Sequence, residues 1–281
     1  MTDQSTITSL EKKALQLRRD LVEMIGVGKV GHLGGSSSLA EIAAVLYFHK
    51  MKVNKSNPKD ENRDRLLLSK GHAVLIQYAA LAELGIISRS EYPKLKTIDG
   101  LLQGHPDMKT PGIEAVTGSL GQGLSVGGGI ALALKLDKKS SRVYVVMGDG
   151  ELSEGQLWEA AMSACKFKLD NLVGIVDRNK IQATGPTAEV FDIPNIAKKW
   201  EAFGWNVIEV DGHNVKEVAD ALDKAETVKG LPTVIIANTV KGKGFAFAEN
   251  NAAFHNGSLT EDQYKQALAA FDEAAKAIDK R

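Results

Sequence analysis

The sequence predicts an α/β fold, a single doubly wound domain over residues 1–281 with a mostly parallel central sheet flanked by helices. Two short runs rich in β-branched residues, 142–147 and 171–177, have the composition of buried strands. The stretch between them, 151–168, is long enough for one crossover helix, as a right-handed βαβ unit requires. With 281 residues, 43% of them hydrophobic, the chain can bury one large core.

Helical spacing of apolar residues predicts three helices early in the chain, at 10–27, 38–50 and 72–84. Ser38 and Glu41 have the spacing of a capping box at the start of the second helix. The third helix is apolar on nearly all sides and stops at Gly85, so we expect it to be buried. Residues 88–111 are expected to be mostly loop.

The second half alternates helices and strands. Residues 121–136 are glycine-rich and then alanine-rich, which predicts a helix that packs closely at its start. Strands are expected at 142–147, 171–177, 206–210 and 232–238, with a loop at 241–256. The C-terminal segment, 258–281, is predicted to be an amphipathic helix capped by Thr260 and Gln263. One face of this helix carries Tyr264, Leu268, Phe271, Ala275 and Ile278.

Charge and cysteine content exclude several classes of protein. The 35 basic and 35 acidic side chains give a net charge of zero, so no general attraction to nucleic acid or acidic membranes is expected. Cys165 is the only cysteine, which excludes a disulfide within the chain, and its helical surroundings predict a small buried packing group. The start lacks the pattern of a signal peptide, and no apolar run approaches membrane-spanning length. We therefore expect a cytoplasmic protein.

The most informative residues are Gly148-Asp149-Gly150 and Asn179, because each group follows one of two consecutive predicted strands. The carboxyl ends of such strands meet at the edge of the sheet where ligands bind. Asp149 offers a charged oxygen and Asn179 a neutral one, which suits Mg²⁺ bound together with phosphate oxygens. Each motif alone is a common turn, but their placement on neighbouring strands favours a metal-diphosphate site.

These motifs resemble the thiamine-diphosphate signature. The sequences GDGELSEG and, further on, DRNKIQ resemble those of the transketolase family. Five further stretches agree in the family's order: GHLGG (31–35), NRDRLLLSKGHA (62–73), GHPD (104–107), TGSLGQGLS (117–125) and KGKG with HNG (241–257). The resemblance covers nearly the whole chain, and it corresponds to the amino-terminal part of a complete transketolase. It implies a thiamine-diphosphate-binding fold of the diphosphate-binding (PP) type over residues 1–281.

The resemblance also implies an activity, the transfer of a two-carbon ketol unit from a ketose phosphate to an aldose phosphate. The implied cofactors are thiamine diphosphate and Mg²⁺, with Ca²⁺ or Mn²⁺ as substitutes. The implied metal ligands are Asp149, the Asn179 side chain and the Ile181 backbone carbonyl. The implied cofactor-binding residues are His72, Gly118, Ser119, Leu120, Gly148, Asp149, Gly150, Glu151, Asn179, Ile181, Lys241 and His255.

Five side chains are implied to be catalytic. In the family, His32 and His255 lie near the reacting carbons of the donor, His105 near the terminal hydroxyl of the ketol unit, His72 near the diphosphate, and Glu154 at the partner's activating glutamate. The residues alone do not single out these histidines, because a lone histidine is more often structural. We assign His49 no site role and interpret His213 as a turn residue.

Three motifs have simpler explanations. Glu154 at the start of a helix also stabilises the helix dipole. Lys241 in a lysine-glycine loop could simply be solvated. The glycines at 121–129 are superficially similar to a dinucleotide fingerprint, but that fingerprint follows a strand, and Gly121 follows a turn-rich segment.

The family's glutamate that activates the cofactor has no counterpart in this chain, and neither do the family's residues that bind the sugar phosphate. The chain alone is therefore expected to be inactive. The expected partner is a carboxyl-terminal transketolase subunit that carries the pyrimidine-binding domain, in an α2β2 heterotetramer that acts on sugar phosphates. The initiating methionine and the complete last helix favour a natural subunit over a truncation. The alternatives are half of another thiamine-diphosphate enzyme, of the deoxyxylulose-phosphate synthase or 2-oxo-acid dehydrogenase type, and a non-catalytic homologue.

Overall fold

A computed structural model describes residues 2–280. Its centre is a parallel sheet in the order β1-β2-β3-β7-β6, in which all neighbouring strands run in the same direction. The strands are β1 (Arg65–Leu68), β2 (Val143–Gly148), β3 (Leu172–Arg178), β6 (Asn206–Asp211) and β7 (Thr233–Asn238). A short antiparallel pair, β4 (Ile181–Gln182) and β5 (Gly185–Pro186), lies outside this sheet.

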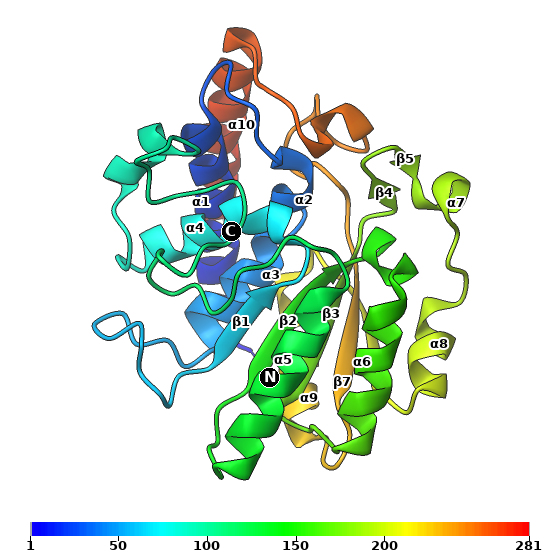
Figure 1. The fold of residues 1–281 in the computed structure, drawn as a ribbon. Helices are drawn as coiled ribbons and strands as arrows, with labels where there is room; N and C mark the ends of the chain where they lie inside the picture. The colour runs from blue at the N-terminus through cyan, green and yellow to red at the C-terminus, as the bar shows by residue number, and fades with distance from the viewer. Residues whose placement is uncertain (1, 281) are drawn as a thin grey trace.

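Helices cover both faces of the sheet (Figure 1). One side carries α1 (Gln4–Ile25), α3 (Ala40–Val45), α4 (Val74–Glu83), α9 (Val215–Thr227) and α10 (Glu261–Asp279). The other side carries α5 (Gln122–Leu136), α6 (Gly155–Lys166) and α8 (Ile196–Ala202). Two short helices, α2 (Leu33–Ser37) and α7 (Thr187–Val190), complete the set. The predicted α/β fold class, a mostly parallel sheet flanked by helices, is therefore confirmed.

Strand β2 divides its side chains between the two cores. Tyr144 and Val146 pack into the core under α1, α3 and α4, whereas Val143, Val145 and Met147 pack into the core under α5 and α6. This alternation follows from the two-residue period of a strand, and burial on both sides explains the continuous apolar run. The glycine in α5 at position 127 permits the close approach of that helix, because a Cβ there would lie 2.4 Å from Val145.

The first and last helices pack side by side (Figure 1). Helix α1 starts at Gln4, earlier than the predicted residue 10, because the Asp3 side chain accepts the Thr6 N–H as an N-cap. Helix α10 begins with the predicted capping box of Thr260 and Gln263. Its Phe271 is buried against the core of α1. An amphipathic helix is thus present at Glu261–Asp279, within the predicted segment 258–281. No helix within residues 2–280 is both long and apolar enough to cross a bilayer.

The predicted start of the helix at 38–50 is wrong, because α3 begins at Ala40. Ser38 has helical dihedral angles and follows α2, while Leu39 precedes α3, so Ser38 does not cap the helix. Its hydroxyl instead donates a hydrogen bond to Asp177, and Glu41 pairs with Arg18. Residues Leu46–Lys50 continue as a π-helical turn. The capping-box spacing is coincidental, because both polar side chains serve buried tertiary contacts.

Other elements have no counterpart among the predicted ones. Strand β1 has only four residues, and helices α8 and α9 lie in segments for which the sequence predicts no element. Cys165 is only half-buried, because it lies on a side of α6 that the core covers partly. The loop expected at 88–111 is confirmed apart from a 3-10 turn at Arg89–Lys94.

Candidate active site

The carboxyl ends of β2 and β3 bring the two leading motifs together. Gly148 pairs with Asp177 in the sheet register, so Asp149 and Asn179 follow at adjacent strand ends. The Lys180 N–H donates to Asp149 Oδ2 over 2.6 Å, which joins the two motifs directly. Asn179 Oδ1 accepts the Ile181 N–H over 3.1 Å. The predicted adjacency of Asp149 and Asn179 is therefore confirmed.

A pocket of about 330 Å³ opens at this edge of the sheet, which is the size of a small-molecule site. Every predicted site residue except Ser119 lines it. The predicted residues in its wall are His32, His72, His105, Gly118, Leu120, Gly148, Asp149, Gly150, Glu151, Glu154, Asn179, Ile181, Lys241 and His255. Ser119 is exposed beside the pocket, and Glu154 is an exposed residue at its wall.

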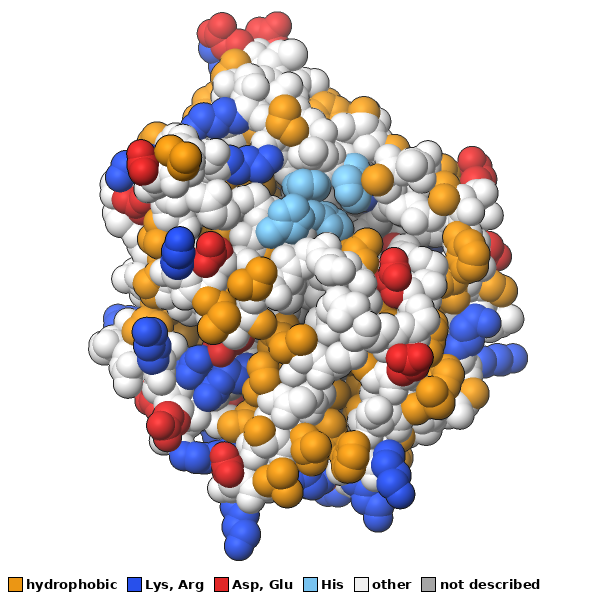
Figure 2. Space-filling model, viewed as in Figure 1, with side chains coloured by type: hydrophobic (Ala, Val, Ile, Leu, Met, Phe, Trp, Pro, Cys, Tyr) orange, Lys and Arg blue, Asp and Glu red, His pale blue; other side chains and the backbone are white. Residues whose placement is uncertain are grey.

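Four histidines form one cluster in the pocket, visible as the pale blue patch in Figure 2. The His32 ring lies 5.2 Å from the His72 ring, 5.9 Å from the His105 ring and 5.6 Å from the His255 ring, between centroids. The His72 and His255 rings are 4.9 Å apart. These residues come from four distant segments of the chain, so the fold alone assembles the cluster.

Burial and nearby positive charge keep these histidines neutral. Burial, with His255 and Lys96 nearby, lowers the pKa of His32 to about 4. Burial and the Lys70 ammonium lower the pKa of His72 to about 2. Burial and Lys241 lower the pKa of His255 to about 4. The pKa of His105 is also lowered, mainly by burial. Near pH 7 the cluster therefore consists of neutral imidazoles, which can accept protons.

Lys241 contributes a buried cation to the same pocket. Its side chain is fully buried, and its Nζ lies 2.7 Å from the Ile181 carbonyl oxygen and 2.7 Å from His255 Nδ1. Burial and the neighbouring Lys70 lower the pKa of Lys241 to about 8. A buried ammonium bonded to neutral groups favours an anionic ligand. The simpler expectation of a solvated lysine is wrong.

Asp149 has the opposite electrostatic character. Its carboxylate is buried, and among the described residues it accepts hydrogen bonds from the backbone N–H groups of Gly150 and Lys180. Burial and the nearby Asp177 carboxylate raise the pKa of Asp149 to about 6. The raised pKa shows that positive charge around this carboxylate does not compensate its burial. A divalent cation would supply that compensation.

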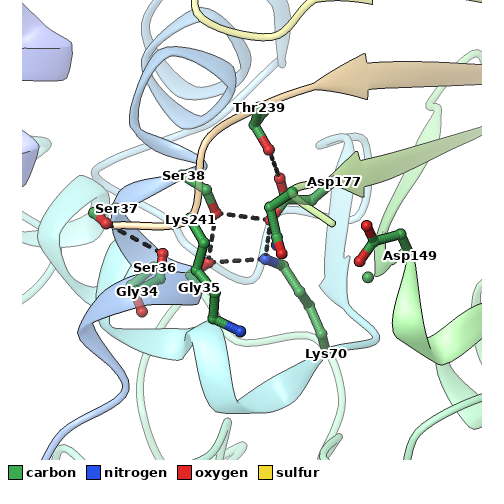
Figure 3. Close-up of polar contacts among 12 residues, drawn as sticks. Gly34, Gly35, Ser36, Ser37, Ser38, Lys70, Asp149, Asp177, Thr239 and Lys241 are labelled. Atoms are coloured by element: carbon green, nitrogen blue, oxygen red, sulfur yellow. Dashed lines mark hydrogen bonds and ion pairs between the residues drawn. The ribbon is translucent and has the colours of Figure 1, made fainter. Parts of the chain in front are cut away.

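A buried polar network, which the sequence motifs do not reveal, lies beneath the pocket. Asp177 accepts hydrogen bonds from Ser38, Lys70 and Asn179 on one oxygen and from Thr239 on the other. Figure 3 shows Ser38, Lys70 and Thr239 converging on this carboxylate. Asn179 Nδ2 donates a hydrogen bond to Asp177, and this contact defines the orientation of the Asn179 amide. The acceptor atom of the amide, Oδ1, therefore points away from Asp177. Recognising 65–68 as a strand would have placed Lys70 at the same sheet edge.

Glycines and Glu151 shape another part of the pocket wall, which adjoins His105. Glu151 Oε1 accepts the Gly121 N–H over 2.7 Å, and Oε2 accepts the Gly148 N–H over 3.0 Å, so this buried carboxylate braces two segments of the wall. Gly118 has a φ of 138°, and a Cβ there would lie 2.6 Å from the His105 ring. The dinucleotide alternative fails, because Gly121 follows turns and caps α5 instead of leaving a strand.

Comparisons with known proteins agree with this geometry. The family model described as transketolase, thiamine diphosphate binding domain, matches residues 10–276. The chain is 40% identical over 274 residues to one of the subunits of the apulose-4-phosphate transketolase of Phocaeicola vulgatus, covering 98% of each chain. It is 44% identical over 264 residues to the SqwG subunit of the 6-deoxy-6-sulfo-D-fructose transketolase of a Clostridium species, covering 94% of this chain and 96% of that one.

The solved transketolases are longer. The fold matches the transketolase of Campylobacter jejuni with a TM-score of 0.85 and 30% identity, over 99% of this chain but only 47% of that chain. The present chain therefore spans less than half the length of that enzyme. These matches confirm the resemblance inferred from the motifs. The chain belongs to the transketolase family, and it corresponds to the family's amino-terminal, thiamine-diphosphate-binding domain.

Proposed function

We propose that this chain is the amino-terminal subunit of a transketolase that transfers a two-carbon ketol unit from a ketose phosphate to an aldose phosphate. The observation that carries the proposal is the presence in one pocket of a strand-end oxygen cluster, a buried ammonium and four neutral histidines. Ketol transfer requires both halves of this arrangement. A metal-diphosphate cofactor must be anchored, and proton acceptors must lie near the sugar hydroxyls.

The residues at the sheet edge fit a Mg²⁺-diphosphate group. Asp149, the Asn179 side chain and the Ile181 carbonyl offer only oxygen, the donor that Mg²⁺ prefers. The undercompensated Asp149 carboxylate favours a cation at that place. Lys241, whose Nζ lies 2.7 Å from the Ile181 carbonyl oxygen, and His72 would contact the diphosphate oxygens in the same pocket. Ca²⁺ or Mn²⁺ would be accepted by the same donor set.

The histidines would carry the proton transfers. When bound, thiamine diphosphate supplies the electron sink for cleavage of the carbon-carbon bond. His32 and His255 would accept and return protons at the sugar hydroxyls, since their lowered pKa values keep them neutral near pH 7. His105 would hold the terminal hydroxyl of the ketol unit. Gly118, Ser119 and Leu120 would contact the cofactor's aminopyrimidine.

The partner subunit would dock on the outer surface of α5 and α6. The exposed positions of α5 between Gln122 and Lys135 are Val126, Gly129 and Ala133, so the middle of its outer side is apolar. Met162 and Phe167 on or next to α6 are about half exposed, at 52% and 50%. Figure 2 shows separate hydrophobic patches, in orange, on the face of the molecule that also carries the histidine pocket. Such a surface favours a protein partner, here a carboxyl-terminal transketolase subunit in an α2β2 heterotetramer.

Glu154 supports this arrangement because it lies exposed at the pocket, before the first residue of α6. It would contact the partner's cofactor-activating glutamate. The donor is a ketose with an anionic end, since the two relatives are named for a sugar phosphate and a sulfosugar. A cytoplasmic location belongs to the same proposal, because the chain's single cysteine offers no internal disulfide.

Reconstitution tests the proposal. The chain is mixed with its carboxyl-terminal partner, Mg²⁺ and thiamine diphosphate, and ketol transfer is measured with pentose phosphates, apulose 4-phosphate and 6-deoxy-6-sulfofructose as donors. Transfer that requires both subunits and the cofactor supports the proposal. A well-folded complex without activity on any of these ketoses would contradict it.

A further inference from the structure

His213 occupies a bridging position that its place in a turn does not require. Its Nδ1 lies 2.9 Å from Glu41 Oε2, and its Nε2 accepts the backbone N–H of Val240 over 2.9 Å. The side chain is 14% exposed, so both contacts are largely shielded from water. Val240 directly precedes Lys241, the buried cation of the pocket. The imidazole therefore connects helix α3 to the backbone of the active-site loop.

The hydrogen bonds define which nitrogen of His213 carries the proton. A backbone N–H can only donate, so Nε2 must present its lone pair to Val240. The proton is then on Nδ1, where it is donated to the Glu41 carboxylate. A carboxylate that fixes the tautomer of a histidine in this way also fixes the orientation of its ring.

Arg18 holds the other end of this relay. Its guanidinium donates to both carboxylate oxygens of Glu41, over 2.5 Å and 2.6 Å. Burial opposes ionisation of Glu41, but Arg18 and His213 outweigh it and lower the pKa of Glu41 to about 2. Arg18 and Glu41 thus form a charge-balanced buried pair beside a neutral imidazole. The relay is rigid, because each member is held by at least two hydrogen bonds.

The backbone around Lys241 is fixed at three points. The Val240 N–H is held by His213, the Gly242 N–H donates to the Gly34 carbonyl over 3.1 Å, and the Lys241 carbonyl accepts the Asn250 N–H over 2.9 Å. Two of these contacts are backbone to backbone. The contact at Val240 is the one made by a side chain, so it is the one that a substitution can remove.

We infer that His213 is a positioning residue for Lys241, because its Nε2 fixes the backbone from which the Lys241 side chain reaches into the pocket. The inference rests on the proposed function only in so far as Lys241 binds the cofactor's diphosphate. The relay Arg18-Glu41-His213 lies outside the pocket wall, so it acts through the loop and not by touching the ligand.

The test compares His213→Gln with His213→Asn in the full chain. Glutamine reaches the position of Nε2 and keeps an acceptor for Val240, whereas asparagine reaches only the position of Nδ1 and keeps only the contact to Glu41. In hydrogen-deuterium exchange, the Val240 amide is expected to exchange about fivefold faster in His213→Asn, the factor of one net hydrogen bond, and within about twofold of the original in His213→Gln. Equal exchange in the two variants overturns the inference.

Cofactor binding supplies the second measurement, made on the chain with its partner and Mg²⁺. His213→Asn is expected to raise the apparent KM for thiamine diphosphate about fivefold, with kcat at saturating cofactor kept, and His213→Gln to change neither by more than about twofold. A faster Val240 exchange with an unchanged KM overturns the role toward Lys241. If the original complex binds no thiamine diphosphate, the proposed function fails, and the exchange data still decide whether His213 holds the loop.

A measurement on the original chain covers the case in which His213→Asn does not fold. In ¹⁵N-labelled histidine spectra, His213 is expected to show a protonated Nδ1 and an unprotonated Nε2. The opposite tautomer would be incompatible with acceptance of the Val240 N–H, and it would overturn the inference.

Discussion

Lys70 and Asp177 form an ion pair that lies almost entirely inside the protein, with side chains 2% and 0% exposed. Removing two charges from water is costly, and a buried pair persists only when further hydrogen bonds satisfy its remaining atoms. Ser38 and Thr239 provide those bonds to the carboxylate. The pair joins the end of β1 to the end of β3, directly beside Asn179.

The first prediction concerns this pair. Lys70→Met is expected to lower the free energy of unfolding by about 3 to 5 kcal/mol, because it leaves the Asp177 carboxylate buried without its cation. The double variant Lys70→Met with Asp177→Asn should recover most of that loss, since both charges are gone and the amide can still bond to Thr239 and Ser38. Urea unfolding measures both effects. A single variant within about 1 kcal/mol of the original would show that the pair's charges are compensated elsewhere.

The second prediction is a pH dependence that arises from His72. Its pKa is about 2 in the folded chain and near 6.5 when unfolded, so the unfolded state binds the extra proton. The contribution of His72 to the free energy of unfolding is therefore fully present above pH 6.5. It is lost as the pH falls from 6.5 towards the pKa of His72 in the folded chain. Between pH 7 and pH 4.5 the loss from His72 alone amounts to about 3 kcal/mol.

His72→Gln tests this dependence in urea unfolding at pH 7 and pH 4.5. The variant should lose less stability on acidification than the original chain does. His49→Gln is the matched control, because His49 is exposed and lies outside the pocket. An identical acid response in His72→Gln and the original chain would refute the assignment to His72.

The third prediction concerns Lys241. Lys241→Met is expected to weaken thiamine diphosphate binding at least tenfold in the complex with Mg²⁺ and partner, because it removes the buried ammonium of the pocket, which the proposed function places at the diphosphate. Lys139→Met removes a partly exposed lysine that lies outside the pocket wall, and it serves as control. Isothermal titration measures both. Unchanged affinity in Lys241→Met would mean that this cation serves only its contacts with Ile181 and His255.

The fourth prediction separates catalysis from cofactor binding. His255→Ala in the reconstituted enzyme is expected to reduce kcat by about 10² to 10⁴, the range of a general acid-base residue. Thiamine diphosphate binding should fall by a smaller factor, because Lys241 remains. Steady-state kinetics with a saturating ketose donor provide the measurement. Turnover that survives the substitution unchanged would contradict a proton-transfer role for His255.

The fifth prediction concerns assembly. Val126→Arg places a charge on the outer side of α5, where Val126 is 40% exposed, and is expected to weaken the complex with the partner at least tenfold. The isolated chain should fold normally, since the position faces solvent. Leu231→Arg, at an equally exposed position in the loop before β7, is the control. Analytical ultracentrifugation of the mixed subunits distinguishes them, and equal assembly of both variants would place the partner on another surface.

Much of the fold and of the site could be predicted from sequence because the relevant residues stand at strand ends. Asp149 and Asn179 follow apolar runs that only a buried strand explains, and parallel pairing then places them together. Family motifs supplied the histidines, whose individual sequence contexts carry no such signal. Most residues that line the pocket were thus identified from the strand patterns and motifs in which they lie.

The buried network was not predictable in the same way. In the sequence Asp177 is only the polar end of a strand, and its complete burial depends on Ser38, Lys70 and Thr239 from three other segments. The prediction of Ser38 as a helix cap is wrong for the same reason. The residues next to a charged or hydroxyl side chain do not reveal that its hydrogen-bond partner lies far away in the sequence. His213, a turn residue by its local sequence, becomes informative only when α3 lies beside it.

The histidine cluster draws on the whole length of the chain, since His32 lies near its beginning and His255 near its end. During synthesis, the pocket cannot close until the segment carrying His255 has emerged and packed. A ligand that binds only the closed pocket would stabilise the folded chain over the unfolded one by mass action. In the complex with the partner, loss of the cofactor would therefore report that one of the two histidine-bearing segments is missing or no longer packed.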